Sequence, residues 1–223
     1  MASTALVTGI SGFIGLHCAR ELLQRGFRVR GTLRSLSRSD SIRATLMKHA
    51  DGIGERLEFA SADLTKDEGW SDAVAGCEFV LHIASPLPRT MPKHEDELIV
   101  PARDGALRVL RAAAASDVKR VVMTSSVAAI AYGHGANHGR TLTEDDWSNL
   151  DNAVPAYPRS KTLAERAAWD FVQSHERKPA LELVVINPGV VLWPVLDEDW
   201  GTSGELVRRL MAGEVPALPK IGW

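Results

Sequence analysis

Two side chains suited to acid catalysis lie four residues apart, at Tyr157 and Lys161 in the run Tyr-Pro-Arg-Ser-Lys. On a helix, positions i and i+4 share one face. An ammonium group this close favours the ionised form of a phenol, so such a tyrosine can protonate a carbonyl oxygen near neutral pH. Pro158 fits this helix if the helix begins near Pro155, because N–H groups of the first turn have no intrahelical partner. A Tyr-x-x-x-Lys pair also arises by chance, so the pair needs support from other residues.

Ser126 is a third candidate, since it follows an expected strand over residues 119–125. Its hydroxyl can hydrogen-bond the same carbonyl oxygen, but serine at such a place also caps helices and turns. His134 and His138 are four residues apart, yet no cysteine or carboxylate completes a ligand set. We therefore interpret them as solvated loop residues and predict no metal. His82 lies in an apolar run and is interpreted as a core residue.

The start of the chain predicts a phosphate-binding turn. An apolar run over residues 5–7 meets Gly9, Gly12 and Gly15, and an amphipathic stretch follows. Glycines permit positive φ and close approach of a ligand. The unpaired N–H groups and dipole of the first helical turn suit a pyrophosphate. The spacing Gly-x-x-Gly-x-x-Gly differs from the familiar Gly-x-Gly-x-x-Gly of dinucleotide sites, so alone it is a moderate signal.

The loop after the expected second strand favours NADP(H) over NAD(H). A carboxylate about 20 residues beyond the glycines would bind the ribose hydroxyls of NAD, but the stretch from Gly31 to Arg38 has none. Arg34 offers a planar donor fork suited to a 2′-phosphate, and Ser35 and Arg38 could add a hydroxyl and a second charge. A solvated basic loop would have the same composition.

Apolar runs alternate with helical patterns along the chain, which indicates βαβ units and a parallel sheet. The runs are nearly continuous, as in strands buried on both faces. We expect a Rossmann-type, doubly wound α/β fold with helices on both faces of the sheet. The expected strands cover residues 5–7, 27–33, 56–61, 78–83, 119–125 and 181–186; the expected helices cover 13–25, 42–49, 67–75, 98–115, 156–174 and 203–212, and residues 133–153 form a loop.

Ligands bind such sheets at the carboxyl ends of the strands. Asp63 and Leu64 follow the third strand and could contact an adenine. Asp63 could equally cap a helix or close a turn, so both interpretations stay open.

Composition narrows the class of protein. The net charge of −2 gives no electrostatic footprint for nucleic acid or an anionic membrane. Cys18 and Cys77 lie far apart without a C-x-x-C pair and indicate a reducing compartment. The N-terminus does not resemble a signal peptide, and no apolar run has membrane-spanning length. We expect a cytoplasmic protein.

Taken together, these motifs resemble the extended short-chain dehydrogenase/reductases. The resemblance rests on Thr8-Gly9-x-x-Gly12-x-x-Gly15, Ser126 and Tyr157-x-x-x-Lys161. The runs His82-Ile-Ala-Ser-Pro86, Val121-Val-Met-Thr-Ser-Ser126 and Tyr157-Pro-Arg-Ser-Lys-Thr-Leu-Ala-Glu165 are similar to the dihydroflavonol reductase-like branch. That branch includes cinnamoyl-CoA reductases and NADPH-dependent aldehyde and ketone reductases.

The resemblance implies a role for each of these residues. Ser126 would orient a carbonyl group, Tyr157 would donate the proton, and Lys161 would assist the phenol and hold the nicotinamide ribose. Asn187 would border the nicotinamide with its neighbours, and Val127 with residues 130–132 would line the substrate side. The expected cofactor-binding residues are Thr8, Gly9, Ser11, Gly12, Phe13, Ile14, Gly15, Arg34, Arg38, Asp63, Leu64, Ala84, Ser85, Tyr157, Lys161, Pro188, Gly189 and Val190.

The resemblance also implies a domain division. Residues 1–190 would form the dinucleotide-binding domain, and 191–223 would begin a small substrate lobe. Such enzymes continue past the position of Trp223, so the chain would be either a truncated form or a natural short relative. The first hypothesis is an NADPH-dependent reductase of a small carbonyl substrate. The second is a non-catalytic NADP-binding protein, and the third is a nucleotide-sugar epimerase or dehydratase. The helices at 98–115 and 156–174 could form a homodimer seam or simply cover the sheet.

Overall fold

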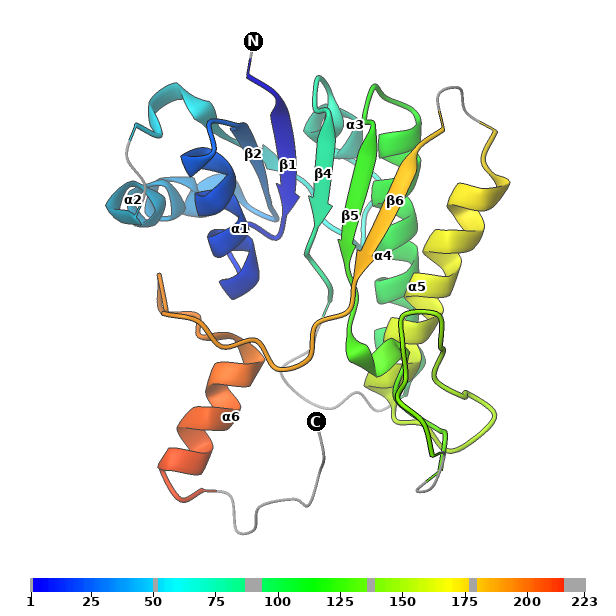
Figure 1. Cartoon of the computed structure of the whole chain (residues 1–223). Helices are drawn as coiled ribbons and strands as arrows, with labels where there is room; N and C mark the ends of the chain where they lie inside the picture. Colours follow the sequence, from blue (N-terminus) through cyan, green and yellow to red (C-terminus); the bar gives the residue numbers. More distant parts are fainter. Residues whose placement is uncertain (1, 50–51, 87–93, 136–138, 177–179, 215–223) are drawn as a thin grey trace.

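A computed structural model describes residues 2–49, 52–86, 94–135, 139–176 and 180–214. Its centre is a parallel sheet of six strands in the order β3-β2-β1-β4-β5-β6 (Figure 1). This order confirms the expected doubly wound Rossmann-type fold. The strands are β1 (Thr4–Thr8), β2 (Arg28–Leu33), β3 (Leu57–Ser61), β4 (Phe79–His82), β5 (Arg120–Thr124) and β6 (Glu182–Ile186).

Helices pack on both faces of the sheet. The α-helices are α1 (Phe13–Gln24), α2 (Ser39–His49), α3 (Trp70–Val74), α4 (Asp96–Ala114), α5 (Ala156–Ser174) and α6 (Gly201–Met211), and the short 3-10 helices are η1 (Leu36–Arg38), η2 (Gly54–Arg56) and η3 (Val127–Ala129). Consecutive residues of β1 belong to the two hydrophobic cores on opposite faces of the sheet. Leu6 belongs to the core under α3, α4 and α5, and Val7 to the core under α1 and α2. This alternation is the period-2 geometry of a strand buried on both sides.

Five helices, α1, α2, α3, α4 and α6, differ from their expected bounds by one to three residues. The helix expected over 67–75 is only Trp70–Val74, because Gly69 before it has φ of +84°, a left-handed conformation that an α-helix does not contain. The helix expected from Leu98 begins two residues earlier, at Asp96, and contains Pro101. The helix expected at 156–174 has those bounds.

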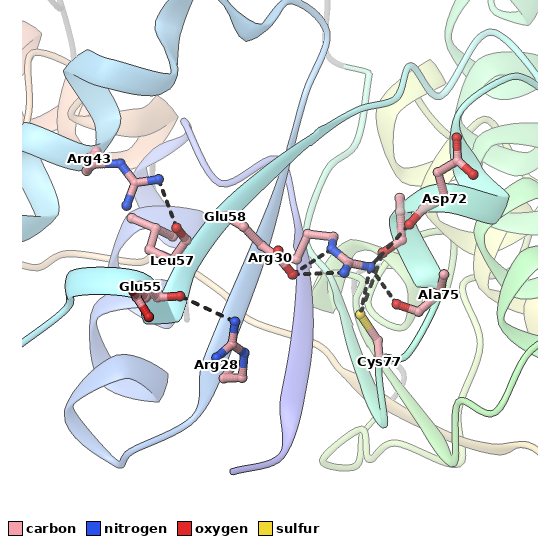
Figure 2. A network of polar contacts seen from close by, with 10 residues as sticks. Arg28, Arg30, Arg43, Glu55, Leu57, Glu58, Asp72, Ala75 and Cys77 are labelled. Carbon is pink, nitrogen blue, oxygen red and sulfur yellow. Dashed lines mark hydrogen bonds and ion pairs between the residues drawn. The ribbon is translucent and has the colours of Figure 1, made fainter. Parts of the chain in front are cut away.

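Arg30 on β2 ties the sheet to the end of α3 (Figure 2). Its guanidinium forms an ion pair with Glu58 on β3 at 2.8 Å. It also donates to three carbonyl oxygens at the end of α3 and just after it, those of Asp72, Ala73 and Ala75. The last carbonyl groups of a helix lack intrahelical partners, and a cation satisfies them well.

The α1 side of the sheet is covered unevenly. Val7, Leu81, Val122 and Val184 form one row of register partners across β1, β4, β5 and β6. Val7 is fully buried, whereas Val184 is 38% exposed. In Figure 1, α4 lies behind β5 and β6 and α5 lies to the right of β6, while the front of these strands is open. Within the described residues, β6 therefore has a helical cover on one face only.

Candidate active site

The glycine-rich turn between β1 and α1 has the conformation that its sequence predicts. Gly9 has φ of +65°, and the Gly12 N–H donates to Gly9 O at 3.0 Å. A Cβ at Gly15 would lie 2.2 Å from Gly9 O, so only glycine lets the helix approach the turn this closely. Gly12 is the N-cap of α1 and offers no side-chain cap, and the first turn has no acidic residue. The N–H groups of this turn suit an anion.

Thr8, just before this turn, connects it by hydrogen bonds to the end of β4. Its hydroxyl accepts from the N–H groups of Ile83 and Ala84, both at 3.0 Å, and lies 2.9 Å from His82 Nδ1. Burial lowers the pKa of His82 to about 3, so the ring is neutral. His82 is thus a hydrogen-bonded core residue, as expected. Thr8 is fully buried and is not among the residues that line the cavity described below.

At the end of β2, Arg34 is exposed and lines the cavity. Thr32, on the same strand, accepts a hydrogen bond from the N–H of Gly9 at 3.2 Å and so joins β2 to the glycine turn. Arg38 does not line the cavity; its guanidinium lies 4.0 Å from the Asp197 carboxylate. The side chain of Ser35 accepts from Ser37 N at the start of η1.

Asp63 closes a turn and also lines the cavity. Its Oδ1 accepts from the N–H and from the hydroxyl of Thr65, both at 2.9 Å. These hydrogen bonds hold the pKa of the Asp63 carboxyl below its ordinary value. Trp70 donates its indole N–H to Asp63 O and so fixes the same turn from the side of α3.

Tyr157 and Lys161 lie in the first two turns of α5, which begins at Ala156 as Pro158 requires. Tyr157 is 38% exposed, whereas Lys161 is 8% exposed, and the Lys161 Nζ lies 5.9 Å from the centre of the Tyr157 ring. Burial lowers the pKa of Lys161 to about 8, and the nearby Glu165 carboxylate opposes this fall. Lys161 is therefore mainly cationic at neutral pH, inside an environment with little water to screen it.

Ser126 follows β5, and its Oγ accepts from Ala128 N at 3.1 Å as the cap of η3. A hydroxyl that accepts in this way still has its own hydrogen to donate. Next to it, the Oγ of Ser125 is buried and has no hydrogen-bond partner within the described residues. Both serines line the cavity, and the Ser126 hydroxyl keeps its hydrogen for a bound molecule.

One cavity of about 560 Å³ joins these parts along the carboxyl ends of the strands. It brings together sixteen of the expected residues: Gly9, Ser11, Gly12, Phe13, Ile14, Gly15, Arg34, Asp63, Leu64, Ala84, Ser85, Ser126, Tyr157, Lys161, Pro188 and Gly189. Thr8, Arg38 and Val190 are not in its lining, and Val191 takes part instead of Val190.

Sequence reasoning missed several lining residues. The segment before and at the start of α6 contributes Asp199, Gly201, Thr202 and Ser203. Gly201 has φ of +66°, and a Cβ there would lie 3.3 Å from the Cβ of Phe13. Thr-Ser before an amphipathic stretch is a helix-start signal, but nothing in the local sequence indicates that this helix start faces the glycine turn.

Two further expectations concern metals and membranes. Within the described ranges, no three His, Cys, Asp or Glu side chains lie close enough together to hold a metal ion. His134 contacts Ile130 O through Nε2 at 2.7 Å, and His138 lies outside the described residues. In the same part of the chain, no helix has the length and apolar character to cross a bilayer.

The fold and the cavity define a dinucleotide-binding protein. A strand, a glycine turn and an uncapped helix N-terminus form the phosphate end, and the cavity runs from there to a serine, a tyrosine and a lysine. The chain belongs to the NAD dependent epimerase/dehydratase family, whose model matches residues 5–192. This confirms the expected resemblance to the extended short-chain dehydrogenase/reductases and their dihydroflavonol reductase-like branch.

The relatives include several reductases. The chain is 35% identical to cinnamoyl-CoA reductase CAD2 of Medicago truncatula over 96% of this chain and 65% of that protein. It is similar to the crystal structure of yeast methylglyoxal/isovaleraldehyde reductase Gre2 complexed with NADPH, with a TM-score of 0.81 and 29% identity over 94% of this chain and 66% of that one. Vestitone reductase from alfalfa gives a TM-score of 0.74, with 29% identity over 93% of this chain and 63% of that one. The chain thus spans about two thirds of the length of these proteins.

Proposed function

We propose that this chain is an NADPH-dependent reductase that reduces the carbonyl group of an aldehyde or ketone. The observation that carries the proposal is the shared cavity: Ser126, Tyr157 and Lys161 line one part of it, and the glycine turn and Arg34 line the rest. The reductases among the relatives support the same reaction class. The yeast relative was solved with NADPH, which supports that cofactor here.

The residues of the cavity fit a dinucleotide. Gly12 caps α1 with its backbone alone, so the N–H groups of the first turn are open to a pyrophosphate. The guanidinium of Arg34 suits a 2′-phosphate, and no acidic side chain stands at the end of β2 to repel it. When bound, the nicotinamide cofactor supplies the hydride.

Side chains of the protein then bind the carbonyl oxygen and donate a proton to it. Ser126 donates its hydroxyl hydrogen to that oxygen while its Oγ accepts from Ala128 N–H. Tyr157 gives the phenolic proton to the same oxygen. Lys161 stays cationic on the next turn of α5, which stabilises the phenolate left behind and leaves its ammonium donors for the ribose hydroxyls.

A second candidate is a protein that binds NADP without turnover. It would need only the glycine turn and Arg34, which line the cavity whether or not a carbonyl substrate is reduced. An epimerase or dehydratase role ranks third, because the residues after Ser126 are Val127, Ala128 and Ala129, with no acidic side chain.

The test is a comparison of cofactor binding with turnover. NADPH and NADH are titrated into the purified chain by quenching of tryptophan fluorescence. Loss of NADPH absorbance is then followed with methylglyoxal and isovaleraldehyde, the aldehydes named for the yeast relative. We expect tighter binding of NADPH than of NADH, and turnover with at least one aldehyde. Binding without turnover would select the non-catalytic candidate, and no binding would reject both.

A further inference from the structure

Glu165 on α5 is a buried carboxylate to which the reaction above gives no role. Only 5% of the residue is exposed, and it does not line the cavity. It lies one helical turn after Lys161, on the same side of α5. Burial of a carboxylate is costly unless it is hydrogen-bonded or paired with a charge. Neighbouring groups must therefore supply a hydrogen bond or an opposite charge to the Glu165 carboxylate.

Asn187 supplies the hydrogen bond. Its side-chain amide donates to Glu165 Oε2 at 2.8 Å and to the backbone oxygen of Ser126 at 3.2 Å. One amide thus links α5, the segment after β5 and the segment after β6. The backbone holds the last two in register, because Ser125 N donates to Ile186 O at 2.8 Å and Val127 N to Pro188 O at 3.1 Å. The carboxylate is anchored to the rigid end of the sheet.

The titratable groups around Lys161 come from two elements. On α5 itself, Tyr157 lies one turn before it and Glu165 one turn after it. From β4, His82 faces it as a neutral ring, since burial holds the pKa of that imidazole low. Burial also lowers the pKa of the Lys161 ammonium, and the Glu165 carboxylate is the charge that works against this effect. A lysine buried to this extent without such a charge would lose its proton more readily.

We propose that Glu165 is a positioning residue, which rests on the proposed function: its anchored carboxylate, one helical turn after Lys161, keeps the ammonium group of Lys161 cationic beside Tyr157. It acts through Lys161 and does not touch the reacting atoms. Asn187 fixes the carboxylate and, through Ser126 O, sets its position relative to the serine. The charge state of Lys161 thus depends on Glu165 and on its amide partner Asn187.

The decisive variant is Glu165→Gln, which keeps an oxygen to accept from Asn187 and removes the charge. The pKa of Lys161 is measured in the full chain by NMR titration of 13C,15N-labelled lysine side chains, with the signal assigned by its loss in Lys161→Arg. We expect the pKa of Lys161 to fall by about one unit, the size typical of a lost neighbouring charge. Glu182→Gln is the matched control, because Glu182 is an exposed glutamate of β6 that pairs with Arg120 of β5. It should leave the pKa of Lys161 unchanged.

Turnover gives the second readout. Above both pKa values, a fall of one unit lowers the cationic fraction of Lys161 about tenfold. In Glu165→Gln, kcat at pH 9 should therefore fall about tenfold, and kcat at pH 6 should stay within about threefold of the wild type. A merely structural role would lower the melting temperature without moving the pH profile or the pKa of Lys161, and that result would overturn the proposal.

Glu165→Asp keeps the charge and provides a second test if Glu165→Gln does not fold. Its Lys161 pKa should stay near the wild-type value, and a fall of a full unit there would contradict the proposal. The NMR readout needs no substrate. A chain without carbonyl turnover would thus refute the proposed function while this measurement still decides the role of Glu165.

Discussion

Tyr157 is the residue on which the proposed chemistry depends most directly. It lies in the cavity with Ser126 and has the Lys161 ammonium within 5.9 Å of its ring centre. Tyr157→Phe removes the proton donor and keeps the ring. We expect kcat to fall by at least about 100-fold, as for loss of a general acid, with the dissociation constant of NADPH within about threefold of the wild type. Steady-state kinetics and fluorescence titration measure the two effects; retained turnover would disprove the acid assignment.

Arg34 is the residue expected to distinguish the two cofactors. Its guanidinium lines the cavity at the end of β2, where a carboxylate would favour NAD. Arg34→Ala should weaken NADPH binding about tenfold, the scale of one charge-assisted hydrogen bond, and leave NADH binding nearly unchanged. Titrations with both cofactors check this. Arg25→Ala, at an exposed arginine paired with Glu21, is the control. Equal losses for NADPH and NADH would remove the case for 2′-phosphate recognition.

At the scale of elements, two glycines of the turn between β1 and α1 are expected to have different roles. Gly15 is needed for folding, and Gly12 for binding of the cofactor. Gly15→Ala would place a Cβ 2.2 Å from Gly9 O, a backbone atom that cannot move aside. We expect it to destabilise the chain by at least about 2 kcal/mol, within the range for overpacking. At Gly12, φ is −89° and a Cβ would meet only Gly9 O, at 3.5 Å. Gly12→Ala should therefore fold normally.

Gly12→Ala should nevertheless bind NADPH at least about tenfold more weakly, because the new methyl group lies where the pyrophosphate approaches the helix. Thermal unfolding measures the first effect and fluorescence titration the second, and each variant is the control for the other. Normal stability of Gly15→Ala would contradict the role of Gly15 in folding. Unchanged NADPH affinity of Gly12→Ala would contradict the role of Gly12 in pyrophosphate binding.

The elements themselves were largely predictable, because buried parallel strands appear as apolar runs and their ends carry the polar motifs. Ser126 was identified as a candidate on these grounds, and Tyr157 and Lys161 by their i, i+4 spacing on a helix; the roles of all three stay predictions. What the sequence could not indicate were contacts between distant segments. The pairing of Arg38 with Asp197 and the approach of Gly201 to Phe13 each join residues more than a hundred positions apart. Neither leaves a periodic pattern in the local sequence.

The same limit applies to the link from Glu165 through Asn187 to Ser126. Each of the three lies in a stretch whose local pattern is clear, a helix or a strand end. A buried carboxylate on a helix nevertheless has the same sequence appearance as a solvated one. Only the packing of α5 against the sheet distinguishes them, since that packing decides which side of the helix loses water.

At the scale of the molecule, three expectations stay predictions: the domain division at residue 190, the cytoplasmic location and the homodimer. The cavity is lined both by residues before 190 and by Val191, Asp199 and Gly201 after it. The segment after β6 thus takes part in the cavity that the glycine turn begins. The α4 and α5 helices pack against one another and the sheet, as either a dimer seam or a simple cover would require.

The open side of β6 is the feature of the whole molecule with the clearest physical consequence. Val184 and Ile186 are 38% and 50% exposed there, and Trp193 beyond the strand is 63% exposed. Parallel sheets are normally covered on both faces, and contiguous exposed apolar surface promotes association. We expect the isolated chain to bind a hydrophobic dye and to self-associate as its concentration rises. Val184→Thr with Ile186→Thr keeps β-branched residues in the strand and should reduce both effects, measured by dye fluorescence and sedimentation velocity. Met47→Gln is the control, because it removes an exposed apolar side chain on α2; it should change neither dye binding nor self-association. If Met47→Gln reduced them as much as the double variant of β6, the open face of β6 would not be the surface through which the chain associates.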